Sequence, residues 1–279
     1  MRIVWLNGEW VPADEARISV FDRGLLFGQS VYEVTPVVGG RITNWPYHAA
    51  RLANSLATAN IADDTDWPTV LVELIKRNEM DEGRAYLQVT AGSAGDRDFL
   101  RPEPRPTPNR IASVQPVALI DNPKAETGLR IVLRPDMRWR LRAAKTTQLL
   151  YAVILKEEAK LAGVDDAWMV EDGVITEATS QNAHIIDARG VLVSHPVDHG
   201  VLPGITRISV MTIAREIGLA VEERPFTPGE LFESREAFVS AAGSLVLPVV
   251  EVEGRLIGDG MPGKVTRAIR QSYIARLRA

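Results

Sequence analysis

Lysine is scarce in this chain, and one lysine lies among residues suited to covalent chemistry. The 279 residues contain six lysines and 26 arginines. Lys145 follows two alanines and precedes two threonines, at the predicted start of a long helix. An amine in small, partly apolar surroundings can have its pKa lowered and can attack carbonyl groups. A solvated lysine at a helix start is the ordinary alternative, and Lys145 alone does not decide between the two.

A carboxylate and a possible anion site follow later in the sequence. Glu177 comes after a short predicted strand and before a run of hydroxyl and amide side chains. A carboxylate there can hold a protonated ring nitrogen, although it can equally be a helix cap or a solvated turn residue. Residues 204–207 open a predicted helix, whose backbone N–H groups suit a phosphate together with the Thr206 hydroxyl. Most helix starts bind no ligand, so this signal is weak by itself.

Two further segments offer contacts to an anion. Arg51 lies on a predicted helix and could clamp a phosphate, although a helical arginine is usually solvated. Residues 240–244 are all small, so a backbone could approach a ligand there, or the segment is simply a tight connection between strands. Together these segments supply an amine, a partner for a ring nitrogen and an anion site, with no cluster of metal ligands.

The composition limits which classes of protein could carry this chemistry. At 279 residues the chain is long enough for about two domains, and 46% hydrophobic with 24% charged residues is ordinary globular composition. A net charge of −4 disfavours nucleic acid as a partner. No apolar run is long enough to span a membrane, the N-terminus turns polar too early for a signal peptide, and cysteine is absent. We therefore expect a cytoplasmic protein with no membrane, nucleic-acid or metal partner.

The elements that must position these residues divide into two groups. The first half predicts a hairpin around Asn7-Gly8, an apolar strand region over 25–38, helices over 46–60 and 67–77, and strands over 85–90 and 111–120. Four prolines interrupt residues 101–110. Proline and polar residues then cluster between two apolar segments, which is typical of a boundary. We predict a small N-terminal α+β domain over 1–120 and a linker over 121–125.

The second half, 126–279, predicts a larger α+β domain. Its main features are a strand over 129–133, an amphipathic helix over 146–161 and a further helix over 206–217. Short strands are predicted at 167–171, 174–176, 183–187, 191–194 and 237–240, with a terminal helix over 263–277. The apolar side of the helix over 146–161 consists of Leu149, Leu150, Val153, Ile154 and Leu161. Strands and helices do not alternate regularly, which favours an α+β fold over a doubly wound sheet.

The candidate residues, taken in order, resemble the class IV aminotransferases, the fold-type IV family of pyridoxal-phosphate enzymes. The resemblance covers nearly the whole chain. It is carried by residues 22–24, 27–28, 31–34, 48–52, 138–139 ahead of Lys145, 176–182, and Leu202 with 204–207. It implies a two-domain α+β fold with the active site between the domains, pyridoxal 5'-phosphate as cofactor, and a homodimer.

The resemblance also implies a role for each candidate residue. Lys145 would hold the cofactor and move the proton, Glu177 would keep the ring nitrogen protonated, and Tyr32 would lie on the substrate side. The residues expected to bind the cofactor are Arg51, Lys145, Glu177, Leu202, Ile205, Thr206 and Ala242.

Among the members, the likeness is greatest to D-amino-acid transaminases, which implies transfer of an amino group from D-alanine or a similar donor to a 2-oxo acid. These enzymes hold the substrate carboxylate with an Arg-x-His pair after the strand that ends here at Thr90. This chain has Arg97 there and no histidine. Arg97 either binds the substrate carboxylate or pairs with Asp96 or Asp98.

Four other functions compete with this interpretation. An (R)-selective amine transaminase would not need a strong carboxylate clamp. A branched-chain L-amino-acid aminotransferase would share the cofactor residues, and an aminodeoxychorismate lyase would eliminate pyruvate. A non-catalytic carrier on the same fold would not need Lys145.

Overall fold

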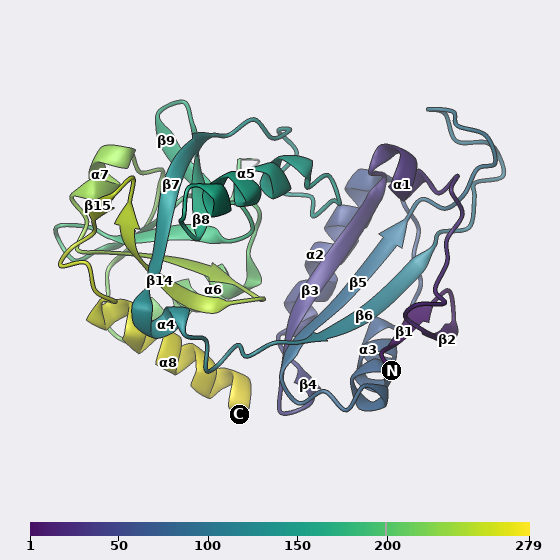
Figure 1. The fold of residues 1–279 in the computed structure, drawn as a ribbon, viewed down its shortest axis with the longest axis horizontal. Coiled ribbons are helices and arrows are strands. Elements are labelled where there is room, and N and C mark those ends of the chain that lie inside the picture. The colour runs from purple at the N-terminus through teal and green to yellow at the C-terminus, as the bar shows by residue number, and fades with distance from the viewer. Residues whose placement is uncertain (199) are drawn as a thin grey trace. The chain divides into compact units, whose positions relative to one another are not determined.

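The computed structural model describes residues 1–198 and 200–279, and the chain divides into two compact units (Figure 1). Unit 1 comprises Met1–Ala118 and Ala144–Gln148, and unit 2 comprises Leu119–Ala143 and Leu149–Ala279. The predicted limits of 1–120, 121–125 and 126–279 stay a prediction of where independently folding domains begin and end.

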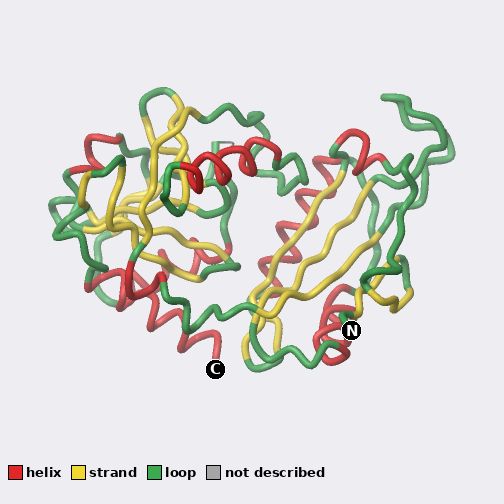
Figure 2. Tube along the Cα trace, viewed as in Figure 1, coloured by secondary structure: helices red, strands yellow, loops and turns green. Residues whose placement is uncertain are grey.

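Unit 1 is built on a sheet with the strand order β2-β1-β6-β5-β3-β4. Its elements are β1 (Ile3–Leu6), β2 (Glu9–Pro12), α1 (Arg23–Phe27), β3 (Ser30–Val38), β4 (Arg41–Ile42), α2 (Trp45–Ala59), α3 (Trp67–Arg77), β5 (Gly83–Thr90) and β6 (Arg110–Pro116). Helix α2 packs on β3, and α3 packs on β1 and β6, so both helices cover the sheet (Figure 2). Apolar side chains from both helices fill this core, including Leu52, Leu71 and Leu74.

The N-terminal hairpin is confirmed, but the apolar run over 25–38 is not one strand. Asn7 and Gly8 both have positive φ between β1 and β2, as a tight hairpin turn requires. The later run is divided because the Asp22 carboxylate accepts hydrogen bonds from two N–H groups at the start of α1. Gly28, with φ 64°, then ends α1 before β3 begins.

Unit 2 is built on a mixed sheet with the order β12-β11-β10-β13-β14-β7-β8-β9, and β15 pairs with β14. Its elements are α4 (Lys124–Thr127), β7 (Leu129–Pro135), α5 (Leu150–Leu161), β8 (Asp166–Glu171), β9 (Val174–Ala178), β10 (Asn182–Ile186), β11 (Leu192–Ser194), α6 (Ile205–Glu216), β12 (Val221–Glu223), α7 (Pro228–Phe232), β13 (Glu236–Ala241), β14 (Leu245–Val252), β15 (Arg255–Leu256) and α8 (Lys264–Arg278). Parallel pairs (β7 with β8 and with β14) occur beside antiparallel hairpins, which confirms the α+β class.

The core of unit 2 lies on both faces of this sheet. Helices α6 and α8 pack on β13 and β14, and α5 packs on β7 and β8. Successive residues of β7 alternate between two clusters: Ile131 belongs to the large core and Val132 to the cluster under α5. This packing holds the sheet, and with it β9 and β10, in place. The connection between these two strands carries the polar residues after Glu177.

In the second half, the prediction of a helix over 146–161 is wrong in part, and one strand was not predicted. The predicted helix begins at Leu150 rather than at residue 146, because residues 144–148 pair with β3 in unit 1. Its apolar side is exposed, whereas Leu155 and Ala159 are the residues that it buries. The central strand β14 was missed, because Pro248 lies inside its apolar run and proline is unusual in a central strand.

Candidate functional site

Lys145 lies on an extended segment held against the first half of β3. Tyr32 donates its N–H to the Lys145 carbonyl at 3.0 Å, and the Lys145 N–H donates to Ser55 Oγ at 3.0 Å. Thr147 donates its N–H to the Ser30 carbonyl at 3.1 Å. The segment therefore forms an isolated β-bridge with β3, between Thr146 and Val31, and is not a helix start. Backbone hydrogen bonds on both sides fix the point from which the lysine side chain leaves the chain.

The amine of Lys145 faces an aromatic ring. Its Nζ lies 4.3 Å from the centroid of the Tyr32 ring, and among the described residues no carboxylate forms an ion pair with it. The Tyr32 ring stacks on Tyr86 with centroids 5.6 Å apart. The Tyr86 hydroxyl donates to Gln88 Oε1 at 2.7 Å, and Gln88 Nε2 donates to Ser30 Oγ at 2.9 Å. An amine without a counter-ion, beside a polar and aromatic sheet face, is available for reaction.

Behind Tyr32, on the opposite face of β3, lies a buried charged cluster. Arg51 donates from Nε and Nη2 to the two oxygens of Glu33, both at 2.7 Å, and His48 Nδ1 lies 2.8 Å from Glu33 Oε2. All three side chains are buried. Arg51 thus uses two of its nitrogens on Glu33, and its predicted contact to a phosphate stays a prediction.

Burial would raise the pKa of Glu33, but the Arg51 charge and the hydrogen bonds from Arg51 and His48 outweigh it and lower the pKa to about 2. Burial also lowers the pKa of His48, so this imidazole is neutral at pH 7, and its Nε2 is buried without a partner. Glu33 is therefore a fixed negative charge that neutralises Arg51.

Glu33 and His48 were not predicted to be functional, although their positions carry a signal. Val31 and Val37 show that odd-numbered positions of β3 face the core. A carboxylate at position 33 must then be buried, and it needs a cation. His48 and Arg51 are three residues apart on α2, which places them on the same side of the helix.

Unit 2 holds the second candidate group, around Glu177 near the end of β9. Arg138 Nη1 donates to Glu177 Oε1 at 2.5 Å. Asn182 Nδ2 at 3.1 Å and the Leu202 N–H at 3.2 Å both donate to Oε2. Burial raises the pKa of this carboxyl, and the Arg138 charge opposes but does not cancel the shift. Glu177 is therefore a buried group that can hold or share a proton.

Arg138 is itself fixed by a second carboxylate. It donates from Nε and Nη2 to Asp136 at 2.9 and 2.7 Å, and Thr176 donates its hydroxyl to the same carboxylate at 2.7 Å. Burial would raise the pKa of Asp136, but the hydrogen bond and charge of Arg138 lower it. Asp136 thus stays ionised and orients Arg138 towards Glu177. From the sequence, Arg138 was only part of the lead-in to Lys145, and Asp136 had no predicted role.

Asn182 connects Glu177 to the predicted anion site. Its Nδ2 donates to the Leu202 carbonyl at 3.0 Å, and a Cβ at position 204 would lie 1.9 Å from its Oδ1. Gly204 is therefore required for this close approach. Gly204 is the N-cap of α6 and has no side chain to cap the first N–H groups of the helix, which come from Ile205 and Thr206 and are of the kind that an anion site uses.

Two predicted anion contacts have more ordinary surroundings. The Thr206 hydroxyl is buried 3.4 Å from the Tyr273 hydroxyl. Ala242 lies in the turn between β13 and β14, and Ser240 just before it pairs with Asn182. Unit 2 therefore brings Glu177, Leu202, Ile205 and Ala242 to one region through Asn182.

Arg97 lies in the loop between β5 and β6. Its Cζ is 5.1 Å from the Phe27 ring centroid and 5.3 Å from that of Phe99. In the part of the chain that the structure describes, Arg97 forms no ion pair with Asp96 or Asp98. The Arg97 guanidinium therefore contacts two aromatic rings and can still bind an anion.

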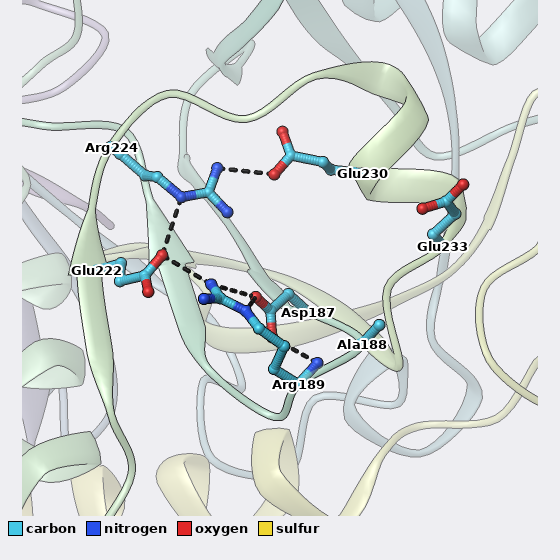
Figure 3. A pocket seen from close by; sticks show the side chains of 7 residues that line it. All are labelled: Asp187, Ala188, Arg189, Glu222, Arg224, Glu230 and Glu233. Atoms are coloured by element: carbon cyan, nitrogen blue, oxygen red, sulfur yellow. Dashed lines mark hydrogen bonds and ion pairs between the residues drawn. The ribbon is translucent and has the colours of Figure 1, made fainter.

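A pocket elsewhere on unit 2 has a different character (Figure 3). Arg189 and Arg224 bridge the carboxylates of Asp187, Glu222 and Glu230 at its walls. None of the predicted site residues lines it. These surface ion pairs join β12 to the loop after β10 and to α7, and they have the form of a structural network rather than a reaction centre.

The described residues include neither a metal-binding cluster nor a membrane-spanning helix. No group of three or more histidine, aspartate or glutamate side chains there could hold a metal ion. None of the helices in that part of the chain is long and apolar enough to cross a membrane.

Comparisons with known proteins agree with this geometry. The sequence model of the Amino-transferase class IV family matches residues 30–252. A D-alanine aminotransferase of Bacillus licheniformis is 34% identical over 96% of this chain and 94% of its own length. A putative branched-chain-amino-acid aminotransferase of Methanocaldococcus jannaschii is 32% identical over 97% of this chain and 94% of its own.

The fold is also that of a solved structure. A branched-chain amino acid aminotransferase from T.th., determined with pyridoxamine 5'-phosphate, matches with a TM-score of 0.88 over 99% of this chain and 93% of its own, at 23% identity. With the family match over most of its length, this chain belongs to the class IV aminotransferases, enzymes that use pyridoxal phosphate.

Proposed function

We propose that this enzyme transfers an amino group between a D-amino acid such as D-alanine and a 2-oxo acid. The observation that carries the proposal is the Lys145 amine, held by backbone hydrogen bonds at both sides and free of any carboxylate partner among the described residues. The likeness to D-alanine aminotransferases over nearly the full chain supports the choice of substrate.

The residues fit pyridoxal phosphate. The Lys145 amine can react with the aldehyde of this cofactor, and the buried Glu177 carboxyl can pair with its ring nitrogen. The uncapped N–H groups that follow Gly204 can bind its phosphate. When bound, the cofactor supplies a ring that accepts the electrons released at the substrate α-carbon. We propose that Lys145 would hold the cofactor covalently, and that Ile205, Thr206, Ala242 and Arg51 would bind its phosphate.

The reaction needs a group that moves one proton. We propose that Lys145 Nζ would be this group, acting first as the base that removes the proton from the substrate α-carbon and then as the acid that gives it up again. The Tyr32 ring beside Nζ limits the directions that the amine can take. Ser55 supports this role, since it fixes the lysine backbone.

Glu177 would act on the ring nitrogen. We propose that its carboxyl accepts a hydrogen bond from the protonated nitrogen, while Arg138 and Asn182 hold it in place. Burial raises the pKa of Glu177 despite Arg138, so a second positive charge beside the carboxyl would favour its ionised form. The protonated ring nitrogen provides such a charge, so the two groups stabilise each other. Leu202, held by the Asn182 amide, would pack against the ring.

The substrate carboxylate needs its own partner. We propose Arg97 for this role, with Tyr32 on the substrate side, because Arg97 is a loop cation that rests on rings and not on an acid. An (R)-amine donor would not depend on Arg97, which makes this residue the discriminating one.

A homodimer stays a proposal, as does the cytoplasmic location. Helix α5 exposes Leu150, Val153, Ile154 and Leu161, a stripe of apolar side chains that a second copy could cover. Sedimentation of the wild type and of Ile154→Glu would test it. A dimer that Ile154→Glu dissociates supports this surface, and a dimer insensitive to the change excludes it.

The test of the function is a single-turnover experiment on the purified, cofactor-loaded protein. We would record its visible absorption band and add D-alanine, L-leucine or an (R)-arylamine separately, without an acceptor. We expect D-alanine to bleach the band and a 2-oxo acid to restore it. Bleaching only by L-leucine or by the arylamine would contradict the D-amino-acid assignment and favour the corresponding alternative. A transaminase releases one equivalent of pyruvate from D-alanine in this half-reaction, so only repeated release of pyruvate from aminodeoxychorismate without an acceptor would indicate a lyase.

A further inference from the structure

Arg23, in the first turn of α1, is a buried arginine without an acidic partner. Arg23 is only 4% exposed. Nη1 donates to the Asp98 carbonyl at 2.7 Å and Nη2 to the Phe99 carbonyl at 2.8 Å, while Nε donates to Gln29 Oε1 at 2.7 Å. Within residues 1–198 and 200–279 no carboxylate forms an ion pair with it. Backbone dipoles therefore compensate its buried charge.

The backbone that receives these hydrogen bonds has little other support. Phe99 and Leu100 are 76% and 79% exposed, so burial of their side chains does not anchor residues 98–100. A planar guanidinium that donates to two successive carbonyls fixes both peptide groups at once. Arg23 is thus the main buried contact that holds this part of the loop in one conformation.

Arg97 depends on the same contacts. Its guanidinium rests on the rings of Phe27 and Phe99. Arg23 itself lies 4.7 Å from the Phe27 ring, and the Phe27 and Phe99 rings are 5.3 Å apart. Because the position of the Phe99 ring follows its backbone, a change at Arg23 would also move the surface on which Arg97 rests.

Arg23 is well anchored on its own side. Gln29, which accepts from Arg23 Nε, also donates to the Ala59 carbonyl at the end of α2 at 3.2 Å. Asp22 caps α1 and accepts from Thr90 Oγ1 at 2.6 Å and from Asn109 Nδ2 at 2.7 Å, at the two ends of the loop. The base is therefore rigid, and the guanidinium projects from it to the loop.

We propose that Arg23 is a positioning residue that sets the direction of Arg97 through residues 98–100, and so selects substrates with a carboxylate. This inference rests on the proposed function, because Arg97 binds the carboxylate there. Lysine at position 23 would keep the positive charge, but it would lose the planar pair of donors. Charge alone is therefore predicted to be insufficient.

The experiment compares Arg23→Lys, Arg97→Met, the double variant and Arg105→Lys in the cofactor-loaded enzyme. Arg105 is the matched control, an exposed arginine of the same loop that donates to the Asn60 side chain. We would measure KM and kcat for D-alanine with a 2-oxo acid, and amide hydrogen exchange of residues 92–101. Gln29→Ala, which removes the acceptor for Nε, is a second variant should Arg23→Lys fold poorly.

We expect Arg23→Lys to raise KM about tenfold with little change in kcat, and to speed exchange in the loop. In the Arg97→Met background the same change should raise KM no further, because both act on one contact. Gln29→Ala should act in the same direction but more weakly, and Arg105→Lys should match the wild type.

An unchanged exchange pattern in Arg23→Lys, or a KM increase of equal size in the Arg97→Met background, would overturn the proposal. The exchange measurement is independent of turnover. If the wild type bleached no band with any donor, the proposed function would fail, whereas the exchange data would still decide whether Arg23 holds the loop.

Discussion

Glu33 and Glu177 are both buried carboxyl groups, each with an arginine in hydrogen-bond contact, yet their pKa values move in opposite directions. Glu33 has two arginine donors and a histidine, and its pKa falls to about 2. Glu177 has one arginine nitrogen, and burial raises its pKa. The difference lies in how the arginine is shared, because Arg138 spends two of its donors on Asp136.

This comparison shows how one residue type can serve two purposes. The negative charge of Glu33 is balanced by Arg51, so this carboxylate can only neutralise and orient that arginine. The surroundings of Glu177 do not fully offset the cost of burying its charge, so its protonation depends on what binds next to it. An incompletely satisfied carboxyl is what a cofactor with a basic ring nitrogen requires, whereas a fully satisfied one stabilises the fold.

The largest effect is expected at the incompletely compensated carboxyl. Glu177→Gln should lower kcat about a thousandfold, because an amide cannot keep the ring nitrogen protonated. Glu177→Asp should recover part of the rate. The measurement is kcat under saturating D-alanine and 2-oxo acid, together with urea unfolding of both variants. Retention of full activity in Glu177→Gln would remove the functional half of the comparison.

Glu33→Gln should instead act on stability. The change leaves the Arg51 charge buried without its carboxylate, which we expect to lower the free energy of unfolding by about 3 kcal/mol. Glu177→Gln should cost at most about 1 kcal/mol, because Arg138 keeps Asp136 as a partner. Urea unfolding at pH 7 compares the two. Equal losses in both variants would show that the carboxyl groups do not differ in the way described.

The pH dependence of unfolding should separate the two groups by sign. The pKa of Glu33 is lowered from 4.5 to about 2, so its contribution is present above pH 4.5 and is lost as the pH falls towards 2, by about 3 kcal/mol. The raised pKa of Glu177 has the reverse effect, which favours the folded state at low pH and is lost as the pH rises through that pKa.

Unfolding curves between pH 2 and 7 for the wild type, Glu33→Gln and Glu177→Gln would test this. Glu33→Gln should show a flatter dependence than the wild type below pH 4.5, whereas Glu177→Gln should differ above pH 4.5, where it should lack the loss of stability with rising pH. Parallel curves for all three proteins would contradict both assignments.

The smallest effect concerns a neutral donor to Glu177. Asn182→Ala removes one hydrogen bond to the carboxyl and one to the Leu202 carbonyl, and we expect kcat to fall about tenfold. The acidic limb of the kcat profile should move to higher pH, because the ionised form loses a donor. A lower kcat without movement of the profile would indicate that Asn182 acts only through Leu202.

Many elements of the fold could be predicted from local sequence signals. Asn7-Gly8 predicted a hairpin, and the helices predicted over 46–60 and 67–77 match α2 and α3 because proline and an apolar stripe mark both. Lys145, Glu177 and residues 204–207 were singled out by residue type and order. Their local surroundings agree with the chemistry assigned to them, although their roles stay proposals.

What could not be predicted depends on contacts between distant segments. Residues 144–148 look like the beginning of a helix, but hydrogen bonds to Ser30 and Tyr32, more than 110 positions away, hold them in an isolated β-bridge with β3. The exposed side of α5 is apolar, whereas an apolar stripe on a helix is typical of a side that faces the core. The role of Asp136 as the partner of Arg138 follows only from the close approach of residues at the ends of β7 and β9 to one another.

The most direct test of the central claim is to locate the covalent attachment of the cofactor. The protein would be loaded with pyridoxal phosphate, treated with borohydride to make the link to lysine permanent, digested and mapped by mass spectrometry. We predict the label on the peptide that contains Lys145 and on none of the other five lysines. A label on another lysine, or no label on Lys145 in a fully loaded protein, would contradict the assignment of this residue as the reactive amine.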